Sequence, residues 1–266
     1  MKVKSYENNT YQKIIEFGLN RPWSLFLGLL YIVAALFALT SINGRFLLEL
    51  NPAVIQFLLS SVTFILLLVI GYVLLSNEYR VIWGFSFLIY AVTFLGLSLN
   101  AINSSFAGIN DPLLSQFWIL PLIILNCGLW IGTSSLFFEN KNLIYLPSLL
   151  IFVLGNSWFL FGSIVLKNME LTISIYSMGL FAPVVLGVAF IWYHFGKDTS
   201  YVSPWLLTVG FGLFGVIHIF WNPWYTAVLG PMFYPIFILY IVSLGLILTG
   251  IRTLTKESNN NTCHLS

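Results

Sequence analysis

Residues 199–251 read TSYVSPWLLTVGFGLFGVIHIFWNPWYTAVLGPMFYPIFILYIVSLGLILTGI, a run of 53 residues without a single Asp, Glu, Lys or Arg. As one helix this run would extend over roughly 80 Å, far more than the hydrocarbon core of a bilayer. It must therefore fold back on itself. Pro223, Gly230 and Pro231 mark the turn, because proline has no backbone N–H and interrupts a helix. The stretch predicts two membrane-crossing helices.

Six other charge-free intervals precede this run, and each contains 23 to 30 residues. A bilayer core of about 30 Å needs roughly 20 apolar residues of helix, so each interval predicts one further span. The fold class that follows is all-α, a polytopic integral membrane helix bundle with eight transmembrane helices. The predicted spans are 23–43, 53–76, 80–100, 116–138, 143–166, 172–195, 202–222 and 231–251.

The segments outside these spans are short, with connections of about 4 to 15 residues, which leaves no room for an extramembrane domain. We therefore expect residues 23–251 to form one transmembrane bundle. A cytoplasmic arm, 1–22, precedes it and a cytoplasmic tail, 252–266, follows it.

The arm has two interpretations. Tyr11, Ile14, Ile15 and Leu19 recur at helical spacing, which is typical of an amphipathic helix on the membrane surface. A disordered arm is the alternative. A cleaved secretory signal competes with the first span, but an apolar run of about 20 residues exceeds the usual length of a signal. We therefore expect a stable first helix.

The composition agrees with this architecture. Only 8% of the 266 residues are charged while 59% are hydrophobic, and the mean hydropathy is +0.92. So few charges cannot cover the surface of a soluble domain, so the lipid bilayer is the expected main solvent. The net charge is only +2 and no Lys/Arg cluster is present, which argues against binding to nucleic acid.

The Lys and Arg residues divide unequally between the two sides of the predicted bundle. An even number of spans puts both termini on one side, and that side holds nine of the 11 Lys and Arg residues. The opposite side holds Arg45 and Lys167 alone. Because cytoplasmic loops are enriched in Lys and Arg, we predict cytoplasmic termini in a multi-pass protein of the plasma (cell) membrane. The nine residues are Lys2, Lys4, Lys13, Arg21, Arg80, Lys141, Lys197, Arg252 and Lys256.

The predicted interior carries little ionisable chemistry, because no Asp, Glu, Lys or Arg falls in the middle of a span. Ion-coupled transport and voltage sensing need such groups at depth, so both are disfavoured. His194 and His218 differ in predicted depth by roughly 20 Å, too much to ligate one haem. Cys127 and Cys263 are also predicted at different depths, which rules out a disulfide between them. We expect no catalytic residue, no cofactor and no metal site.

One polar and aromatic constellation is a candidate site. His218, Trp221, Asn222 and Tyr225 recur at spacings of three, four and seven residues, so they share a helix face near the predicted outer surface. This arrangement favours either an outward-facing pocket or a surface for docking a partner. The alternative is a belt of interfacial aromatics with a capping Asn.

Two amides are predicted inside the bilayer, Asn126 in the fourth span and Asn156 in the fifth. They are candidates for buried polar packing, by bonds to each other or to Ser157 or Thr133 across helices. The second interpretation is that Asn126 and Asn156 line the path of a neutral solute.

Three short motifs have simpler interpretations. Gly210–Gly215 reads GFGLFG and matches a dinucleotide-binding fingerprint, but it lies within an apolar span without a preceding strand, so we interpret it as close helix packing. Asn103 begins an N-glycosylation sequon in a predicted outer loop. Cys263 begins a C-terminal frame that resembles a prenylation signal; its His at the next position favours a chance match.

Three function classes follow. The first is a non-enzymatic membrane subunit that anchors or organises partner proteins in a larger complex, such as an energy-transducing one. The second is a facilitator or permease for a neutral or apolar solute that is not ion-coupled. The third is a lipid-modifying membrane enzyme, which is the weakest because the sequence offers no carboxylate pair, metal set or nucleophile–base pair.

Overall fold

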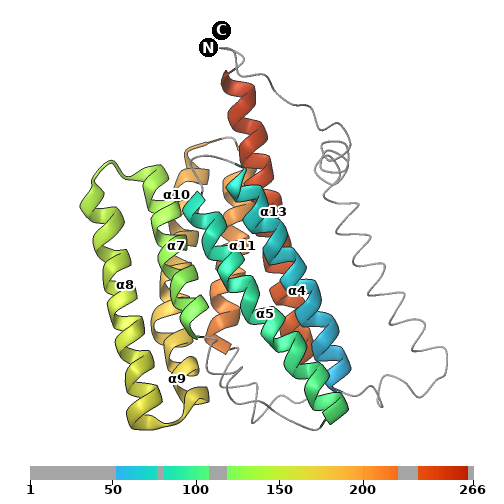
Figure 1. The fold of residues 1–266 in the computed structure, drawn as a ribbon. Coiled ribbons are helices and arrows are strands. Elements are labelled where there is room, and N and C mark those ends of the chain that lie inside the picture. The colour runs from blue at the N-terminus through green and yellow to red at the C-terminus, as the bar shows by residue number, and fades with distance from the viewer. Residues whose placement is uncertain (1–51, 77–80, 108–118, 200, 221–232, 263–266) are drawn as a thin grey trace, which may run out of the picture. The chain divides into compact units, whose positions relative to one another are not determined.

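A computed structural model describes residues 52–76, 81–107, 119–199, 201–220 and 233–262 of the chain. These residues form helices joined by short turns, with no strand among them (Figure 1). The α-helices are α4 (Pro52–Leu75), α5 (Val81–Ala107), α7 (Ile119–Phe137), α8 (Lys141–Phe161), α9 (Met169–Tyr176), α10 (Ala182–Lys197), α11 (Ser203–Phe220) and α13 (Phe233–Thr262). Two π-helical turns, η2 (Gly162–Leu166) and η3 (Ser177–Phe181), continue α8 and join α9 to α10.

Seven of the predicted spans coincide with these helices, while the first, 23–43, lies outside the described residues together with the arm. Six helical segments are long and apolar enough to cross a membrane, and Ser203–Ile219 of α11 is a shorter apolar helix. The helices therefore indicate a multi-pass membrane protein. Two helices run past their predicted ends: α5 continues to Ala107, and α13 continues into the predicted tail as far as Thr262.

The helices of this part of the chain pack in a closed order. Each of α4, α5, α7, α10, α11 and α13 contacts the next in this series, and α13 returns to contact α4. We call these six helices the helix ring. The α8 helix lies outside the ring against α7 and α9 (Figure 1).

Glycines lie where neighbouring helix backbones approach closely. A Cβ atom at Gly210 of α11 would lie 2.8 Å from Ile247 Cγ1 and 3.0 Å from the Ile247 backbone nitrogen. The reverse contact is formed by Gly250 of α13, where a Cβ atom would lie 2.8 Å from Leu207 Cγ. Small residues of this kind allow tight packing of membrane helices, where apolar burial alone gives no preference for protein over lipid.

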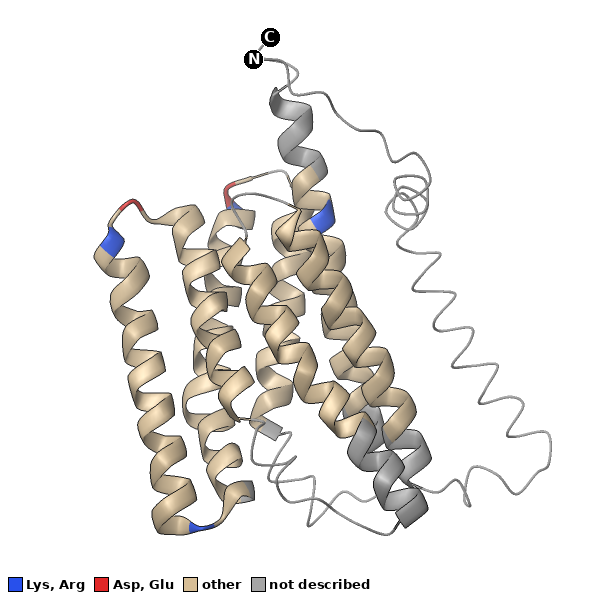
Figure 2. Ribbon diagram, in the orientation of Figure 1, with Lys and Arg blue, Asp and Glu red and all other residues tan. Residues whose placement is uncertain are grey.

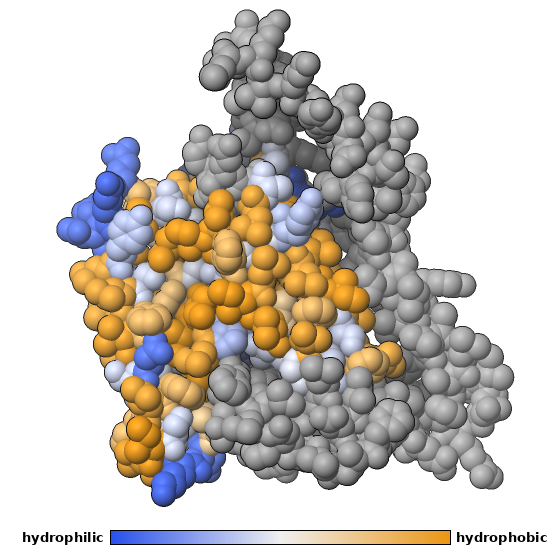
Figure 3. Space-filling view, viewed as in Figure 1, coloured by the Kyte–Doolittle hydropathy of each residue, from blue (hydrophilic) through white to orange (hydrophobic). Residues whose placement is uncertain are grey.

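The α8 helix is attached along one narrow stripe. Its buried residues are Ile144, Ser148, Ile151 and Gly155, at helical spacings of four, three and four. The rest of its surface consists largely of exposed Leu, Val, Phe and Tyr side chains. Figure 3 shows the same pattern, with mainly apolar side chains over the visible face of the bundle and most of the strongly hydrophilic ones towards its ends.

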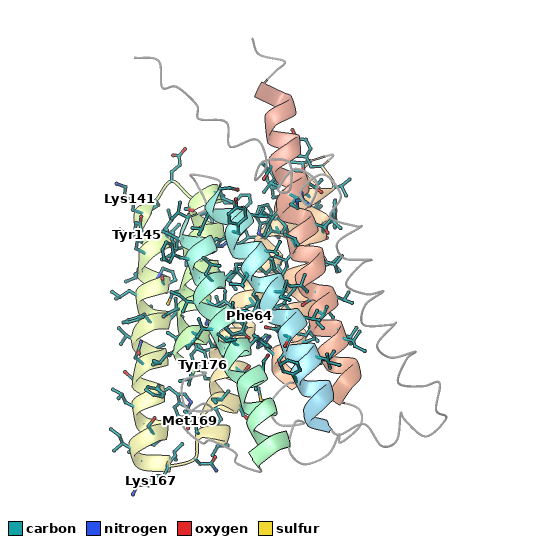
Figure 4. All side chains as sticks on the ribbon, turned by 45° about the vertical axis from the view of Figure 1, so that its right-hand side comes forward. Phe64, Lys141, Tyr145, Lys167, Met169 and Tyr176 are labelled. Carbon is teal, nitrogen blue, oxygen red and sulfur yellow. The ribbon has the colours of Figure 1, made fainter. Side chains whose placement is uncertain are left out.

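Charged side chains lie at or near the ends of the described helices, except on α13, which carries Arg252 within its length (Figure 2). Lys141 begins α8 and Lys167 follows η2, so the two lie at opposite ends of that segment (Figure 4). The next helical segment returns from Lys167 to Lys197 at the end of α10. Lys141 and Lys197 therefore share one end, called here the Lys141 end, and Lys167 lies at the other.

The turn at Lys167 has a specific local structure. Lys167 adopts a left-handed backbone conformation with φ of 50°, and the Asn168 side chain then caps α9 by accepting a hydrogen bond from the Leu171 backbone at 3.1 Å. A Cβ atom at Gly162 would overlap the Thr172 side chain. The turn thus closes α8 and α9 into a tight antiparallel hairpin.

Candidate functional site

His218 of α11 lies inside the bundle, with only 4% of its surface exposed. Its Nδ1 atom is 2.8 Å from the Phe214 carbonyl oxygen, one turn earlier in the same helix. Because a carbonyl can only accept, Nδ1 carries the proton, and in the neutral imidazole Nε2 is then an acceptor. This bond assigns the tautomer and directs Nε2 away from the backbone of α11.

Two tyrosines complete a chain of hydrogen bonds to that acceptor. The Tyr90 hydroxyl of α5 lies 3.4 Å from His218 Nε2, and the Tyr240 hydroxyl of α13 donates to the Tyr90 oxygen at 2.9 Å. All three side chains are buried. The chain therefore joins three helices of the ring through neutral donors and acceptors. We call His218, Tyr90 and Tyr240 the His–Tyr cluster.

The π-helical turn η3 lies against this cluster. The Ser177 hydroxyl donates to the His218 backbone carbonyl at 3.1 Å, and the Phe181 and His218 ring centroids are 4.5 Å apart. Pro183, at the start of α10, has no backbone N–H for the Gly179 carbonyl, so it interrupts the regular helical pattern at this point. Ser177 bonds to a carbonyl and not to the imidazole, so it does not form a nucleophile–base pair with His218.

A second polar cluster lies on the other side of η3. Asn126 of α7 is fully buried, and its amide nitrogen donates to the Tyr176 hydroxyl at 3.3 Å and to the Leu180 carbonyl at 3.5 Å. Asn156 is half-buried, and its amide donates to the Phe152 carbonyl of its own helix at 2.7 Å. The two amides thus bond neither to each other nor to the partners expected from the sequence.

Buried aromatic rings fill the middle of the helix ring. The Trp83 ring of α5 lies 6.2 Å from Trp192 of α10 and 6.1 Å from Phe211 of α11, measured between centroids. The Phe214 ring packs 5.1 Å from Tyr240, next to the His–Tyr cluster. We call this set the aromatic centre; its members are Trp83, Phe94, Phe181, Trp192, Phe211, Phe214, Phe237 and Tyr240, each with at most 1% of its surface exposed.

Only part of the predicted constellation falls within the described residues. His218 is buried among the described helices. Trp221, Asn222 and Tyr225 lie outside the described residues. Asn103 lies within α5, where the sequence predicted a loop, because that helix continues to Ala107.

The glycine motif on α11 is partly explained by packing. Gly210 contacts α13, and a Cβ atom at Gly215 would lie 3.0 Å from Leu186 of α10. Gly212, in contrast, has open space where a Cβ atom would lie. The interpretation as close helix packing thus holds at two of the three glycines.

Comparison with known proteins gives no match. No family model, no curated protein and no solved structure is similar to this chain at a significant level. Within the described residues, no group of three or more His, Cys, Asp or Glu side chains could hold a metal ion.

The sequence interpretation missed the residues that surround His218 and Asn126. Tyr176 is the fifth residue of the predicted span 172–195, but Tyr90 and Tyr240 lie well inside their spans, whereas membrane tyrosines gather at the interfaces. A tyrosine at mid-span must find a hydrogen-bond partner within the protein. The mid-span position of Tyr90 and Tyr240 is thus a signal in the sequence for buried hydrogen bonds, and Pro183 is a signal for the π-helical turn.

Proposed function

We propose that this chain is an eight-span plasma-membrane protein with cytoplasmic termini, and that it anchors or organises partner proteins in a larger membrane complex without catalysing a reaction. The observation that carries this proposal is the aromatic centre. Trp83, Trp192 and Phe211 come from three different helices and pack against one another in the middle of the ring, where a transporter would need a path. A bundle built in this way is a rigid scaffold.

The polar groups of the interior support the same function. The His–Tyr cluster consists of neutral groups that bond to one another and to backbone carbonyls. Buried polar side chains that satisfy each other in this way act as specific links between membrane helices. Such links fix the helix order, which is what a scaffold requires.

The distribution of charges supports the proposed topology. Lys141 and Lys197 share one end of the described bundle and Lys167 lies at the other, in agreement with the division of Lys and Arg residues in the sequence. The positive-inside rule then assigns the Lys141 end to the cytoplasm.

The proposal is tested by purifying the full chain from its native membrane in a mild detergent, with a reversible cross-linker added before solubilisation. We expect one or more proteins to co-purify in a fixed molar ratio that persists through size-exclusion chromatography. Material from the same membranes with an untagged chain is the control. A monomer free of stoichiometric partners, with and without the cross-linker, would refute the organising role.

A facilitator for a neutral solute is the second candidate, because Asn126 is buried between α7 and η3. In this case, vesicles that contain the chain should take up glycerol faster than empty vesicles, and Asn126→Leu should slow the uptake. Asn156→Leu is the matched control, since that amide bonds only within its own helix. Uptake equal to that of empty vesicles would eliminate this candidate.

A further inference from the structure

One face of α7 lies along the helical segment formed by α9, η3 and α10. Asn126, Trp130, Thr133 and Phe137 are spaced by four, three and four residues, so they lie on the same side of α7. The first contacts Leu180 beside α10, and the Phe137 ring lies 5.1 Å from that of Trp192 in α10. We call the contact between these two faces the α7–α10 seam.

Polar atoms without a hydrogen-bond partner lie along this seam. In the described part of the chain, four buried side-chain atoms lack a partner, and three of them belong to the seam: Asn126 Oδ1, Thr133 Oγ1 and Trp192 Nε1. The fourth is Thr93 Oγ1 of α5. A buried polar atom without a partner destabilises a protein, and most so where lipid surrounds the bundle.

Thr133, like Thr93, lacks the side-chain hydrogen bond that most threonines of the described helices form. Thr63 and Thr208, for example, donate to the carbonyl four residues earlier, at 2.9 and 2.8 Å. The corresponding carbonyl for Thr133 is that of Leu129, and it accepts a hydrogen bond from Trp83 Nε1 at 3.1 Å. The carbonyl that would usually accept from this threonine thus already accepts from Trp83, and the Thr133 hydroxyl remains available to a ligand.

We propose that the α7–α10 seam binds small neutral molecules that both donate and accept hydrogen bonds, of which water is the simplest. The Trp192 indole can only donate, so its ligand must offer a lone pair. The Asn126 oxygen can only accept, so its ligand must offer a proton. The Thr133 hydroxyl can do either. A cation would find no lone pair at the indole N–H, and an anion would repel the amide oxygen.

The seam begins near the Lys141 end of the bundle. Trp192 lies five residues before Lys197, the last residue of α10, which places it about 7 Å below that end. Phe137 and Phe195 pack against Trp192 and against each other, with centroids of the two phenylalanines 5.1 Å apart. The inference does not depend on the organising role proposed above.

Radiolytic footprinting of the full chain in H₂¹⁸O tests the proposal, because hydroxyl radicals formed from a bound water oxidise the side chains beside it. Trp83 is the matched control: it is as buried as Trp192, but its indole N–H has a protein partner. We expect ¹⁸O-labelled oxidation of Trp192 to be severalfold faster than that of Trp83. Equal and low rates at both tryptophans would overturn the proposal.

A substitution at Thr133 gives an independent test through the sign of its effect. Thr133→Val keeps the shape of the side chain and removes the hydroxyl. If a bound molecule bonds to that hydroxyl, the variant unfolds at a lower temperature and labelling of Trp192 falls. If the hydroxyl has no ligand, the variant is more stable, which would overturn the proposal. Thr133→Ser, which retains the hydroxyl, should keep the Trp192 labelling.

Discussion

Replacing two glycines of α11, only two residues apart, should have opposite effects on stability. Gly210→Ala places a methyl group 2.8 Å from Ile247 Cγ1 and 3.0 Å from its backbone nitrogen, whereas Gly212→Ala places one in open space. Both variants gain helix propensity of about 1 kcal/mol because alanine replaces glycine within a helix. The difference in stability between the two variants is therefore the cost of the contact between the new methyl group and Ile247.

The size of that cost follows from the distances. Carbon atoms pack best at about 3.5 to 4.0 Å, so α11 and α13 must separate by several tenths of an ångström, and the backbone of Ile247 cannot rotate away as a side chain would. Overpacking of this kind costs about 1–3 kcal/mol. We expect Gly210→Ala to be less stable than Gly212→Ala by about that amount, with Gly212→Ala at or above the wild type.

The assay is equilibrium unfolding of the full chain in mixed micelles by increasing fractions of SDS, followed by circular dichroism. Gly250→Ala, at the reciprocal contact, provides a second measurement. In combination with Gly210→Ala its effect should be less than additive, because one separation of the helices relieves both contacts. Equal stabilities for the variants at 210 and 212 would refute the close approach of α11 and α13.

Three further predictions concern other parts of the fold. Tyr90→Phe removes the hydroxyl that bonds to His218 and should destabilise the bundle by about 1–2 kcal/mol in the same assay; an unchanged midpoint would contradict that bond. Asn168→Ala removes the cap of α9 and should cost about 1 kcal/mol, while Asn168→Asp, which keeps an acceptor, should cost less. Reporters inserted after Lys167 and after Lys197 should lie on opposite sides of the membrane, and finding both on one side would exclude the proposed topology.

The positions of the helices could be predicted from the charges and prolines. Lys141 and Lys197 lie at helix ends in the structure, as the charge-free intervals require. The sequence predicts that the span of α5 ends at residue 100, because the residues that follow are polar and typical of a loop. The helix continues to Ala107, since nothing in that segment prevents helical backbone bonds before the Asp111–Pro112 pair.

The partners within the interior could not be predicted, because hydropathy gives the depth of a residue but not its neighbour. Tyr90 and Tyr240 are 150 residues apart in sequence and meet only because the fold brings α5, α11 and α13 together at His218. The partner of Asn156, the Phe152 carbonyl of its own helix, could not be predicted from hydropathy either. That amide points along its own helix, and the sequence alone does not say which face of α8 is buried.

The aromatic centre also has an electrical consequence. Moving an ion from water into a medium of low dielectric constant costs on the order of 20 kcal/mol without compensating groups. Rings such as Trp83, Trp192 and Phe211 pack together inside the described bundle and carry no charge to offset that cost. An ion between these rings would therefore meet a barrier of the kind that a lipid bilayer presents.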